Sequence, residues 1–351
     1  MTQYVYAGAG HWLSGGEVTS GGLLRKEIDG RTWEPLTNGL PAGAEVRTIA
    51  IHPDNPAVVF AGTQDGPYRS TDGGDHWHKL SFPDAGMVVW TMVFHPRDPH
   101  TLFLGASPAA IYRSDDAGDT WRRLTIVETS GAVSMGFDMR VIRLVVDPTN
   151  PQEMYAGLEV GGVIRSLDGG ESWEDCTEDL LRLAGLEHLK SRIGSDTDTE
   201  GMMDSHSLSV SPAQPGTVFL ATRMGLFRSR DRGGSWADME VGRFSPLTYA
   251  RDVQVAPHDA NVMYAALSPA ARSEDGSLYR SEDLGQTWQR FDRGVAPKST
   301  MMSIGLSRQD ANRVYCATRG GQVFGTLDGG ETWDEFPLPE GLEDVYTVAC
   351  A

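Results

Sequence analysis

Short apolar runs alternate with turn-forming residues along the whole chain. Residues 46–80 read "VRTIAIHPDNPAVVFAGTQDGPYRSTDGGDHWHKL". This order predicts four strands, separated by a Pro-Asp turn, a Gly-bounded loop and an octapeptide turn. Residues 90–124 repeat the scheme. The pattern therefore predicts a series of four-stranded antiparallel units.

The octapeptide turn recurs and sets the period. The pattern S/T-x-D-x-G-x-x-W occurs in six clear copies, which begin at Ser70, Ser114, Ser166, Ser229, Ser281 and Thr326. A seventh copy, "KEIDGRTW" from Lys26, keeps the tryptophan but has lost the serine and has Ile28 in place of the aspartate. Successive tryptophans of the motif lie 44, 44, 52, 63, 52 and 45 residues apart. Such a period is typical of propeller blades.

The two ends of the chain complete one another. The sequence finishes with "DVYTVACA", a first strand without successors, and starts at "YVYAGAG", a second strand without a predecessor. One C-terminal strand and three N-terminal strands would then form one blade, and the closed ring leaves no open sheet edge. We therefore predict an all-β protein in which residues 1–351 form a single seven-bladed β-propeller of four-stranded antiparallel blades.

The repeated motif has an obvious structural use. An Asp side chain can accept backbone N–H bonds across a hairpin turn, Gly supplies a positive φ, and Trp covers the hairpin. On these residues the chain resembles the Asp-box, or BNR-repeat, propellers, a group that includes sialidases, xyloglucan-cleaving hydrolases, sortilin-type receptors and photosystem II assembly factors. The resemblance implies structural roles for the motif aspartates Asp72, Asp116, Asp168, Asp231, Asp283 and Asp328. Function is then expected elsewhere on the ring.

Charge and cysteine content narrow the expected partners and location. The chain has 30 Lys and Arg against 48 Asp and Glu, a formal charge of −18. This charge repels nucleic acid and anionic lipid, so neither is an expected partner. Three widely spaced cysteines do not form a closed disulfide set, and the sequence contains no recognisable leader or long apolar span. We expect a cytoplasmic monomer.

Departures from the repeat point to one face of the ring. The loops that lead into the first strands lengthen at residues 125–139 and 177–205. The second of these insertions is expected to be helical, because its leucines, Leu180, Leu181, Leu183, Leu186 and Leu189, suit a short amphipathic helix. Loops of this length need a reason. Ligands of propellers usually bind at the channel mouth on this face.

Alignment of the predicted first strands yields the candidate site. One row, expected at the channel mouth, contains Arg47, Trp90, Ile142, His206, Arg251, Met302 and Tyr346. In the next row, small polar residues give way to Arg143 and Asp252. Glu159, His206 and Asp252 are the catalytic candidates. The candidates for substrate binding are Arg47, Trp90, Arg140, Arg143, Tyr249, Arg251 and Tyr346.

Several of these residues also have a purely structural interpretation. Arg143 and Asp252 could form an ion pair that closes the ring, since structural pairs cluster charges as active sites do. Of the nine histidines, His11, His188 and His206 fall on the ligand face. His206 is the best placed for proton transfer or metal binding, because imidazole suits either role near neutral pH. A lone histidine is nevertheless more often a hydrogen-bonded spectator.

Three functions remain open from the sequence. The leading hypothesis is a soluble glycosidase-like hydrolase or lyase with a sugar-like or anionic small substrate, using carboxylates as acid, base or nucleophile and arginines as anion clamps. The sequence motif typical of sialidases is absent, and one propeller does not provide the two-propeller cleft of the xyloglucan-cleaving enzymes. A second hypothesis is a non-catalytic ligand-binding or assembly propeller. A third is a metal-centred hydrolase; no cofactor is predicted, although a divalent ion such as calcium could occupy the channel.

Overall fold

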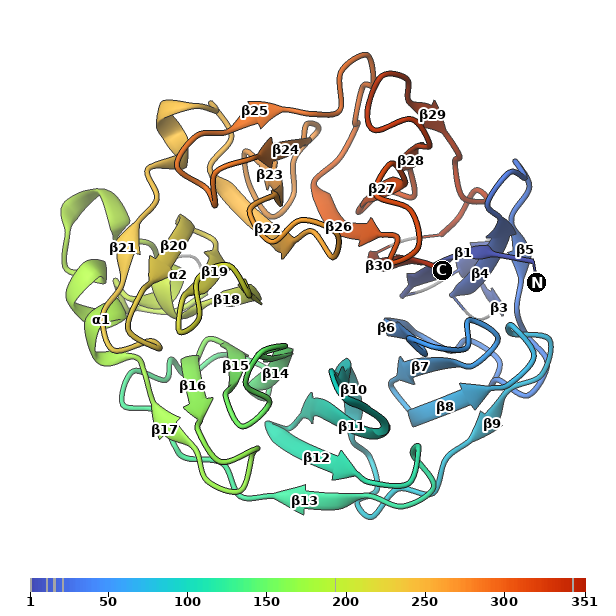
Figure 1. Cartoon of the computed structure of the whole chain (residues 1–351), viewed down its shortest axis with the longest axis horizontal. Helices are drawn as coiled ribbons and strands as arrows, with labels where there is room; N and C mark the ends of the chain where they lie inside the picture. The colour runs from blue at the N-terminus through green and yellow to red at the C-terminus, as the bar shows by residue number, and fades with distance from the viewer. Residues whose placement is uncertain (1, 11, 15–16, 21, 193, 343) are drawn as a thin grey trace.

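Seven four-stranded antiparallel sheets form a closed ring (Figure 1). The computed structural model describes residues 2–10, 12–14, 17–20, 22–192, 194–342 and 344–351. The predicted seven-bladed propeller is therefore confirmed. We number the blades from the one that contains both ends of the chain.

Strands are given for each blade from the channel outwards. Blade 1 contains β30 (Val345–Cys350), β1 (Tyr4–Ala9), β4 (Leu23–Glu27) and β5 (Glu34–Pro35). Blade 2 contains β6 (Val46–Ile51), β7 (Val59–Thr63), β8 (Gly66–Ser70) and β9 (His78–Lys79). Blade 3 contains β10 (Val88–His95), β11 (Asp98–Ser107), β12 (Ala110–Ser114) and β13 (Arg122–Leu124).

The other four blades follow the same order. Blade 4 contains β14 (Arg140–Val146), β15 (Met154–Glu159), β16 (Gly162–Ser166) and β17 (Glu174–Asp175). Blade 5 contains β18 (Ser205–Val210), β19 (Val218–Thr222), β20 (Gly225–Ser229) and β21 (Ala237–Asp238). Blade 6 contains β22 (Tyr249–Val255), β23 (Met263–Ser268), β24 (Ser277–Ser281) and β25 (Gln289–Arg290). Blade 7 contains β26 (Met301–Leu306), β27 (Val314–Thr318), β28 (Val323–Thr326) and β29 (Asp334–Glu335).

The ends of the chain close the ring as predicted. Strand β30 pairs antiparallel with β1, with Val5 opposite Cys350 and Ala7 opposite Val348. Figure 1 shows the two termini side by side in this blade. The core lies between neighbouring blades, where apolar side chains of one sheet pack on the next; Phe60 of blade 2, for example, shares a buried cluster with Leu104 and Trp121 of blade 3.

The first residue and the aspartate of the octapeptide turn make the same hydrogen bonds in all six copies, illustrated here by blade 4, whereas the tryptophan bond described last occurs only in blades 3 and 4 among the described residues. Ser166 Oγ donates to Asp168 Oδ1 at 2.8 Å and accepts from the Gly170 N–H at 2.8 Å. The Asp168 carboxylate accepts from the backbone N–H of Ser172 at 2.9 Å and from its hydroxyl at 2.5 Å. Trp173 is buried and donates from Nε1 to the Gly170 carbonyl at 3.0 Å. The motif thus closes the hairpin between the third and fourth strands of a blade.

The divergent seventh turn uses a different solution. Lys26 stands where the other copies have serine or threonine, and its side chain is buried. Its ammonium donates to the carbonyls of Glu27, Ile28 and Gly30 at 3.1, 2.9 and 3.0 Å and lies 4.0 Å from the centre of the Phe336 ring. A cationic donor to three carbonyls therefore replaces the carboxylate acceptor of the other turns.

Replacing Asp168 with alanine should destabilise the fold by about 1 kcal/mol, since its hydrogen bonds are exposed and water replaces part of each. Bonds from Ser172 and Ser166 lower the pKa of Asp168 from 3.8 to about 2. A carboxylate with a lowered pKa stabilises the fold above its ordinary pKa, and this contribution disappears as the pH falls towards 2. Urea unfolding should therefore separate the variant from the wild type at pH 7 and not at pH 2. Asp29→Ala, at an exposed position of the seventh turn, is the control; an equal loss there would contradict the explanation.

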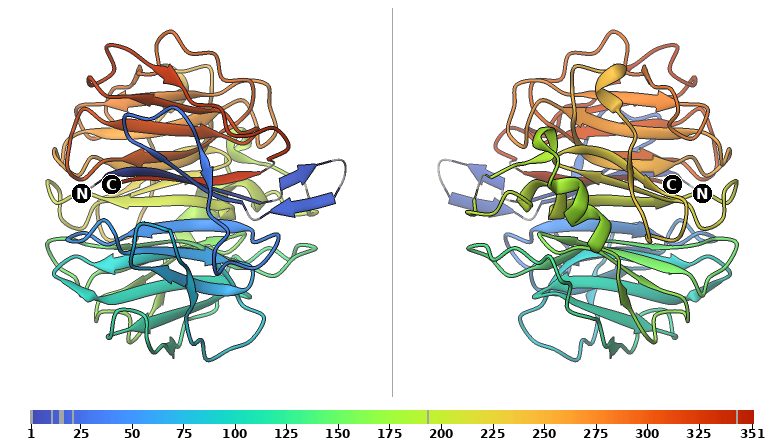
Figure 2. Two further views of the ribbon diagram at one scale, coloured as in Figure 1. Left: turned by 90° about the vertical axis from the view of Figure 1, so that its right-hand side faces the viewer. Right: turned by 90° about the vertical axis from the view of Figure 1, so that its left-hand side faces the viewer.

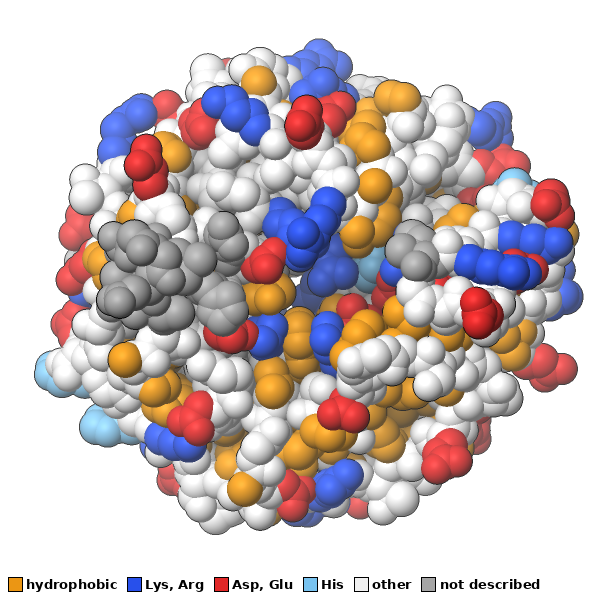
Figure 3. Space-filling view, turned by 180° about the vertical axis from the view of Figure 1, so that it is seen from behind, with side chains coloured by type: hydrophobic (Ala, Val, Ile, Leu, Met, Phe, Trp, Pro, Cys, Tyr) orange, Lys and Arg blue, Asp and Glu red, His pale blue; other side chains and the backbone are white. Residues whose placement is uncertain are grey.

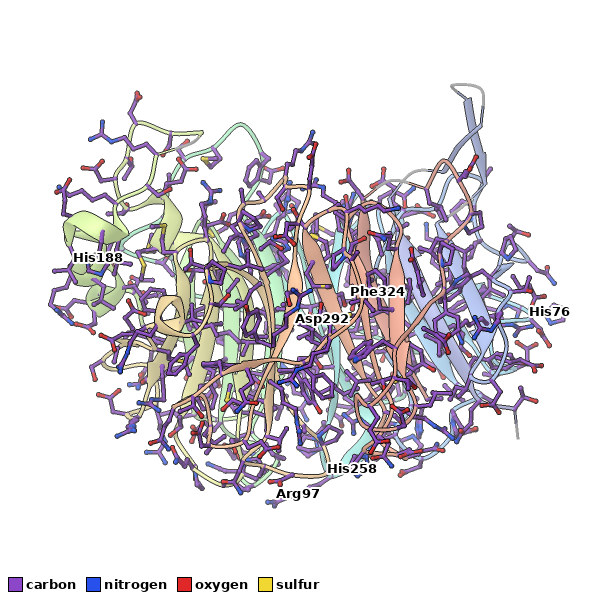
Figure 4. All side chains as sticks on the ribbon, turned by 90° about the horizontal axis from the view of Figure 1, so that it is seen from above. His76, Arg97, His188, His258, Asp292 and Phe324 are labelled. Atoms are coloured by element: carbon purple, nitrogen blue, oxygen red, sulfur yellow. The ribbon has the colours of Figure 1, made fainter. Side chains whose placement is uncertain are left out.

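Two insertions project from one face of the ring. A hairpin of β2 (Trp12–Ser14) and β3 (Glu17–Ser20) joins β1 to β4. The segment between β17 and β18 contains α1 (Glu178–Ala184), the 3-10 helix η1 (Glu187–Leu189) and α2 (Glu200–Met203). A further 3-10 helix, η2 (Val241–Arg243), follows β21. Figure 2 shows the hairpin and the helical segment on the same side, and Figure 4 shows His258 and Arg97 at the opposite face.

The helical segment is more broken than the leucine pattern indicated. Helix α1 ends at Ala184, Gly185 caps it, and η1 is a separate turn. Leu180, Leu183 and Leu189 are buried, whereas Leu186, between the two helices, is 42% exposed. Glycine is a poor helix former, which favours this break. Among the described residues, no helix has the length and apolar character needed to span a membrane.

Candidate functional site

The candidate site begins with an irregularity shared by every first strand. In each blade the pairing between the first and second strands shifts by one residue near the insertion-bearing face. The residue skipped by the pairing is Tyr346, Arg47, Trp90, Ile142, His206, Arg251 or Met302, in order around the ring. A β-bulge leaves its extra residue unpaired and redirects the side chain. The row aligned from the sequence is therefore a row of bulges.

All seven bulged residues line one cavity of about 410 Å³ in the central channel. Arg143 lines it as well, one position further along its strand. Figure 3 shows the insertion-bearing face, with Lys and Arg side chains gathered around the central hollow. The overall charge of the chain is −18, so this basic centre lies in an acidic molecule. A basic, low-dielectric cavity attracts anions.

One wall of the mouth is a stack of arginines and aromatic rings. The Arg47 guanidinium lies 4.3 Å from the centre of the Trp90 ring and 5.0 Å from that of Tyr346. Arg140 lies 4.5 Å from the Trp90 ring and 4.3 Å from that of Phe137. Arg47 also pairs with Glu45, and Arg140 donates to Glu159 at 2.7 Å. Cation–π contacts and these ion pairs together fix the planes of both guanidinium groups.

An ion pair across the channel forms the floor of the mouth. Arg143 of blade 4 donates to Asp252 of blade 6 at 2.7 Å. Asp252 also accepts from Ser207 Oγ at 2.7 Å, Gln254 Nε2 at 2.9 Å and the Ile304 N–H at 3.0 Å. The Asp252 side chain is 1% exposed, whereas that of Arg143 is 32% exposed. One carboxylate thus ties together the first strands of blades 4, 5, 6 and 7, and the arginine presents its free surface to the cavity.

The opposite wall is built around a buried histidine. His206 Nδ1 donates to the Ala250 carbonyl at 2.7 Å, and Nε2 lies 3.2 Å from Asp204 Oδ2 and 3.5 Å from the Tyr249 hydroxyl. The His206 side chain is 1% exposed. Both nitrogens are therefore engaged by the protein. His206 lines the cavity but offers a substrate little access to its titrating atoms.

Asp204 connects this wall to the helical insertion. The residue follows α2 and accepts from Arg223 at 2.8 Å, and Arg223 also pairs with Glu200 of α2 at 2.8 Å. Burial would raise the pKa of Asp204, but the charges of His206, Arg223 and Arg251 lower it to about 2. The Oδ1 atom of Asp204 is buried without a hydrogen-bond partner among the described residues. The insertion is thus fixed to the channel by charged groups.

Arg251 differs from the other arginines of the mouth. It is bulged into the cavity beside His206 and is partly exposed. Within the described part of the chain its guanidinium forms no ion pair, although it hydrogen bonds to Tyr249 and the nearby charges of Glu159 and Asp204 help to raise its pKa. Arg47, Arg140 and Arg143, by contrast, each have a carboxylate partner. Arg251 is consequently the arginine best placed to bind an anionic group of a ligand.

The ten predicted site residues divide into two groups. Six line the cavity, namely Arg47, Trp90, Arg143, His206, Arg251 and Tyr346. The other four, Arg140, Glu159, Tyr249 and Asp252, lie behind or beside these and contact them or one another through the bonds described. His11 lies outside the described residues. Sequence reasoning did not assign Glu45 or Phe137 to the site. Among the described residues, no group of three or more His, Cys, Asp or Glu side chains is arranged to hold a metal ion.

Sequence comparison shows distant relatives among propeller proteins. No protein-family model matches the chain. The chain is 25% identical over 212 residues to xyloglucanase Xgh74A of Acetivibrio thermocellus, covering 57% of this chain and 20% of that protein. It is 24% identical over 281 residues to a xyloglucanase of Hypocrea jecorina, covering 76% of this chain and 28% of that protein. The chain thus spans less than a third of the length of these relatives.

Structural comparison extends the fold similarity to the whole ring. An ancestral GH74 enzyme matches 91% of this chain with a TM-score of 0.60 and 16% identity, and the match covers 39% of that enzyme. YCF48 from Cyanidioschyzon merolae matches 86% of this chain and 87% of its own, with a TM-score of 0.58 and 16% identity. At such identities the matches show the fold alone. The relatives and the seven-bladed ring place the chain in the broad propeller superfamily that includes the xyloglucanases.

Proposed function

We propose that the protein is a glycosidase-like hydrolase or lyase that binds a sugar-like ligand with an anionic group at the channel mouth. The observation that carries this proposal is Arg251, a guanidinium that lines the cavity and forms no ion pair with a described carboxylate, although Glu159 and Asp204 lie near enough for their charges to act on it. A partly buried cation is costly unless an anion meets it, and arginine binds carboxylate, sulfate and phosphate through paired bonds. The xyloglucanase relatives are consistent with a carbohydrate ligand.

The proposed roles of the site residues follow from their accessibility. Glu159 is the catalytic acid or base, because Arg140 engages its Oε2 while the side chain remains 14% exposed. Arg143 is a second anion contact through its exposed surface. Asp252, one of the three catalytic candidates, is reassigned to the framework, since both of its oxygens are fully hydrogen bonded. His206 positions Asp204 and the strand of blade 6 and takes no direct part in proton transfer.

Other features remain proposals from the sequence. Assignment to the Asp-box family is supported by the repeated turn geometry of Ser166 and its equivalents. Three further predictions from the sequence stand unchanged. They are a single domain over residues 1–351, a monomeric state and a cytoplasmic location. A channel metal has no ligand cluster among the described residues to support it.

Replacing Arg251 with methionine should weaken binding of an acidic oligosaccharide by about 10- to 100-fold, the value of one or two charge-assisted hydrogen bonds. Calorimetric titration would compare oligogalacturonate with neutral xyloglucan fragments. Arg243→Met, which removes an exposed arginine on η2, is the matched control and should bind as wild type does. The melting temperature should change little for either variant. Equal binding of the acidic ligand by wild type and Arg251→Met would contradict the proposal.

A second candidate function is a non-catalytic binding propeller. This function is favoured because Asp252 and His206 are buried and hydrogen bonded within the protein. Glu159 is then the one accessible group of the three catalytic candidates. The variant Glu159→Gln separates the two functions. Loss of turnover with unchanged ligand affinity supports the hydrolase, whereas binding that depends on Arg251 with no turnover of any glycoside supports the binding protein.

A further inference from the structure

The blades are joined at their outer edge by a repeated contact. The donor is the Nη1 atom of an arginine that lies just before the octapeptide motif. The acceptor lies in the next blade and is the backbone carbonyl of the residue that follows the motif aspartate. The four donor and acceptor pairs are Arg25 with Gly73 at 2.6 Å, Arg69 with Ala117 at 2.8 Å, Arg113 with Gly169 at 3.4 Å and Arg165 with Arg232 at 2.8 Å. We call this contact the arginine latch. It fills the gap between neighbouring turns and satisfies a turn carbonyl.

Among the described residues three junctions lack the latch: blades 5 and 6, where Arg228 makes no such bond, blades 7 and 1, where Gly325 stands in place of the arginine, and blades 6 and 7. Arg280 holds the equivalent position of blade 6, but it makes no hydrogen bond to the Gly329 carbonyl. Its guanidinium instead pairs with Glu282 at 2.8 Å and lies 5.5 Å from the centre of the Phe291 ring. The Nε atom of Arg280 is buried, and among the described residues no group accepts a hydrogen bond from it. The Nη1 donor that joins two blades elsewhere is therefore paired within blade 6 here.

A larger side chain accompanies the change. Phe291 packs against the turn glycine Gly330, where the other turns meet Leu36, Leu80, Leu124, Cys176 or Met239. The Phe291 ring also contacts Trp333 and Tyr264 in edge-on arrangements, at 5.5 and 5.3 Å between centroids. These contacts fix the ring beneath the Arg280 guanidinium. The aromatic side chain thus keeps this arginine away from the turn of blade 7.

A groove of about 240 Å³ occupies the junction between blades 6 and 7. Three arginines, Arg280, Arg290 and Arg293, line it together with one carboxylate, Glu282, and with Thr287, Gln289, Phe291 and Gly330. Arg280 is balanced by Glu282, and Arg290 is balanced by Asp292 at 3.0 Å. Arg293 is exposed, and no described carboxylate pairs with it. The groove therefore has one more arginine than carboxylate partners, and Arg293 is the arginine without one.

We propose that this groove is a second anion site, separate from the channel, which binds a single oxyanion group such as a phosphate, sulfate or carboxylate. Arg293 supplies the unbalanced charge, and Arg280 supplies a guanidinium whose plane is fixed over Phe291. Gln289 and Arg290 offer further donors along the same groove. Guanidinium groups held in fixed planes recognise oxyanions through directed, charge-assisted bonds. The site does not depend on the function proposed for the channel.

Inorganic phosphate is the first probe, titrated calorimetrically into the full chain at constant ionic strength, with sulfate and acetate as further probes. Arg293→Met is the principal variant, because an exposed arginine without an ion pair can be replaced without loss of folding. It should lower the phosphate affinity of the groove at least tenfold. Arg243→Met is the matched surface control. Arg251→Met removes the channel site alone, so the two sites are measured separately.

The outcomes decide the proposal directly. Phosphate binding that survives Arg251→Met and is lost in Arg293→Met supports the groove. Binding that is lost in Arg251→Met and unchanged in Arg293→Met assigns all anion binding to the channel and overturns it. Arg280→Met tests the second donor, and Arg280→Lys keeps the charge while removing the planar fork. If the lysine variant binds phosphate as wild type does, the geometric part of the proposal is wrong. The relative affinities of phosphate, sulfate and acetate identify the preferred oxyanion.

Discussion

Removing residues 344–351 should abolish cooperative folding. These residues contain all of β30, which is the channel-facing strand of blade 1 and packs between β6 and β26 of the neighbouring blades. Val345, Val348 and Cys350 belong to a buried cluster with residues of β1 and β27. Each buried apolar side chain stabilises the fold by about 1.5 to 3 kcal/mol, so losing three approaches the whole stability of a typical domain. Circular dichroism melting and size-exclusion chromatography would measure the loss.

A permuted chain tests whether the strand itself is responsible. Cys350 lies opposite Val5, so the end of β30 is adjacent to the start of β1. Moving residues 344–351 in front of the N-terminus through a short Gly-rich turn should therefore rebuild blade 1 as a continuous sheet. We expect this permutant to melt close to wild type. A truncated chain that still unfolds cooperatively near the wild-type temperature would show that the other six blades suffice.

Arg143→Met should destabilise the protein by about 3 to 5 kcal/mol, because it leaves the buried Asp252 carboxylate without its ion-pair partner. Asp252 retains three hydrogen bonds from neutral donors, which do not replace the lost charge. Chemical unfolding measures this difference. The double variant Arg143→Met, Asp252→Leu should recover part of the loss, since it removes the uncompensated charge as well.

Arg140→Met is the comparison for this pair. Its partner Glu159 is also at the mouth, but the two side chains are 24% and 14% exposed, and water solvates the remaining carboxylate. A pair of this kind contributes about 1 kcal/mol or less. If Arg143→Met melts as wild type does and loses ligand binding, the floor ion pair serves the ligand and the framework role is wrong.

The blade architecture was predictable because it is repeated. The tryptophan spacing and the six intact octapeptides predict the same turn at six places in the chain. The hydrogen bond between Ser166 and Asp168 has an equivalent in each copy. The divergent copy at Lys26 was recognised by position, but its three carbonyl bonds were not foreseen. A lysine in place of serine reverses donor and acceptor, and only the folded turn shows which carbonyls converge.

The site was less predictable than the fold. Alignment of the first strands found the row that lines the channel, because strand register carries it from blade to blade. The burial and the hydrogen-bond partners of these side chains could not be predicted from the alignment. His206 and Asp252 have the residue types of catalytic groups, yet each is almost wholly buried and fully engaged by groups from other blades. Such contacts depend on how blades 4 to 7 meet across the channel, which no local pattern specifies.

The bulges separate the strand hydrogen bonds that stabilise the ring from the side chains that face a ligand in the channel. A bulged residue takes no part in the ladder of hydrogen bonds, which continues on either side of it. Its side chain can therefore change without a change in strand register, as Ile142, Arg251 and Tyr346 already show at equivalent places. A combinatorial library over these seven positions would vary the shape and charge of the mouth on a constant scaffold. Each blade thus contributes one variable side chain to the mouth, although contacts such as those of Arg47 with Trp90 and Tyr346 couple neighbouring choices.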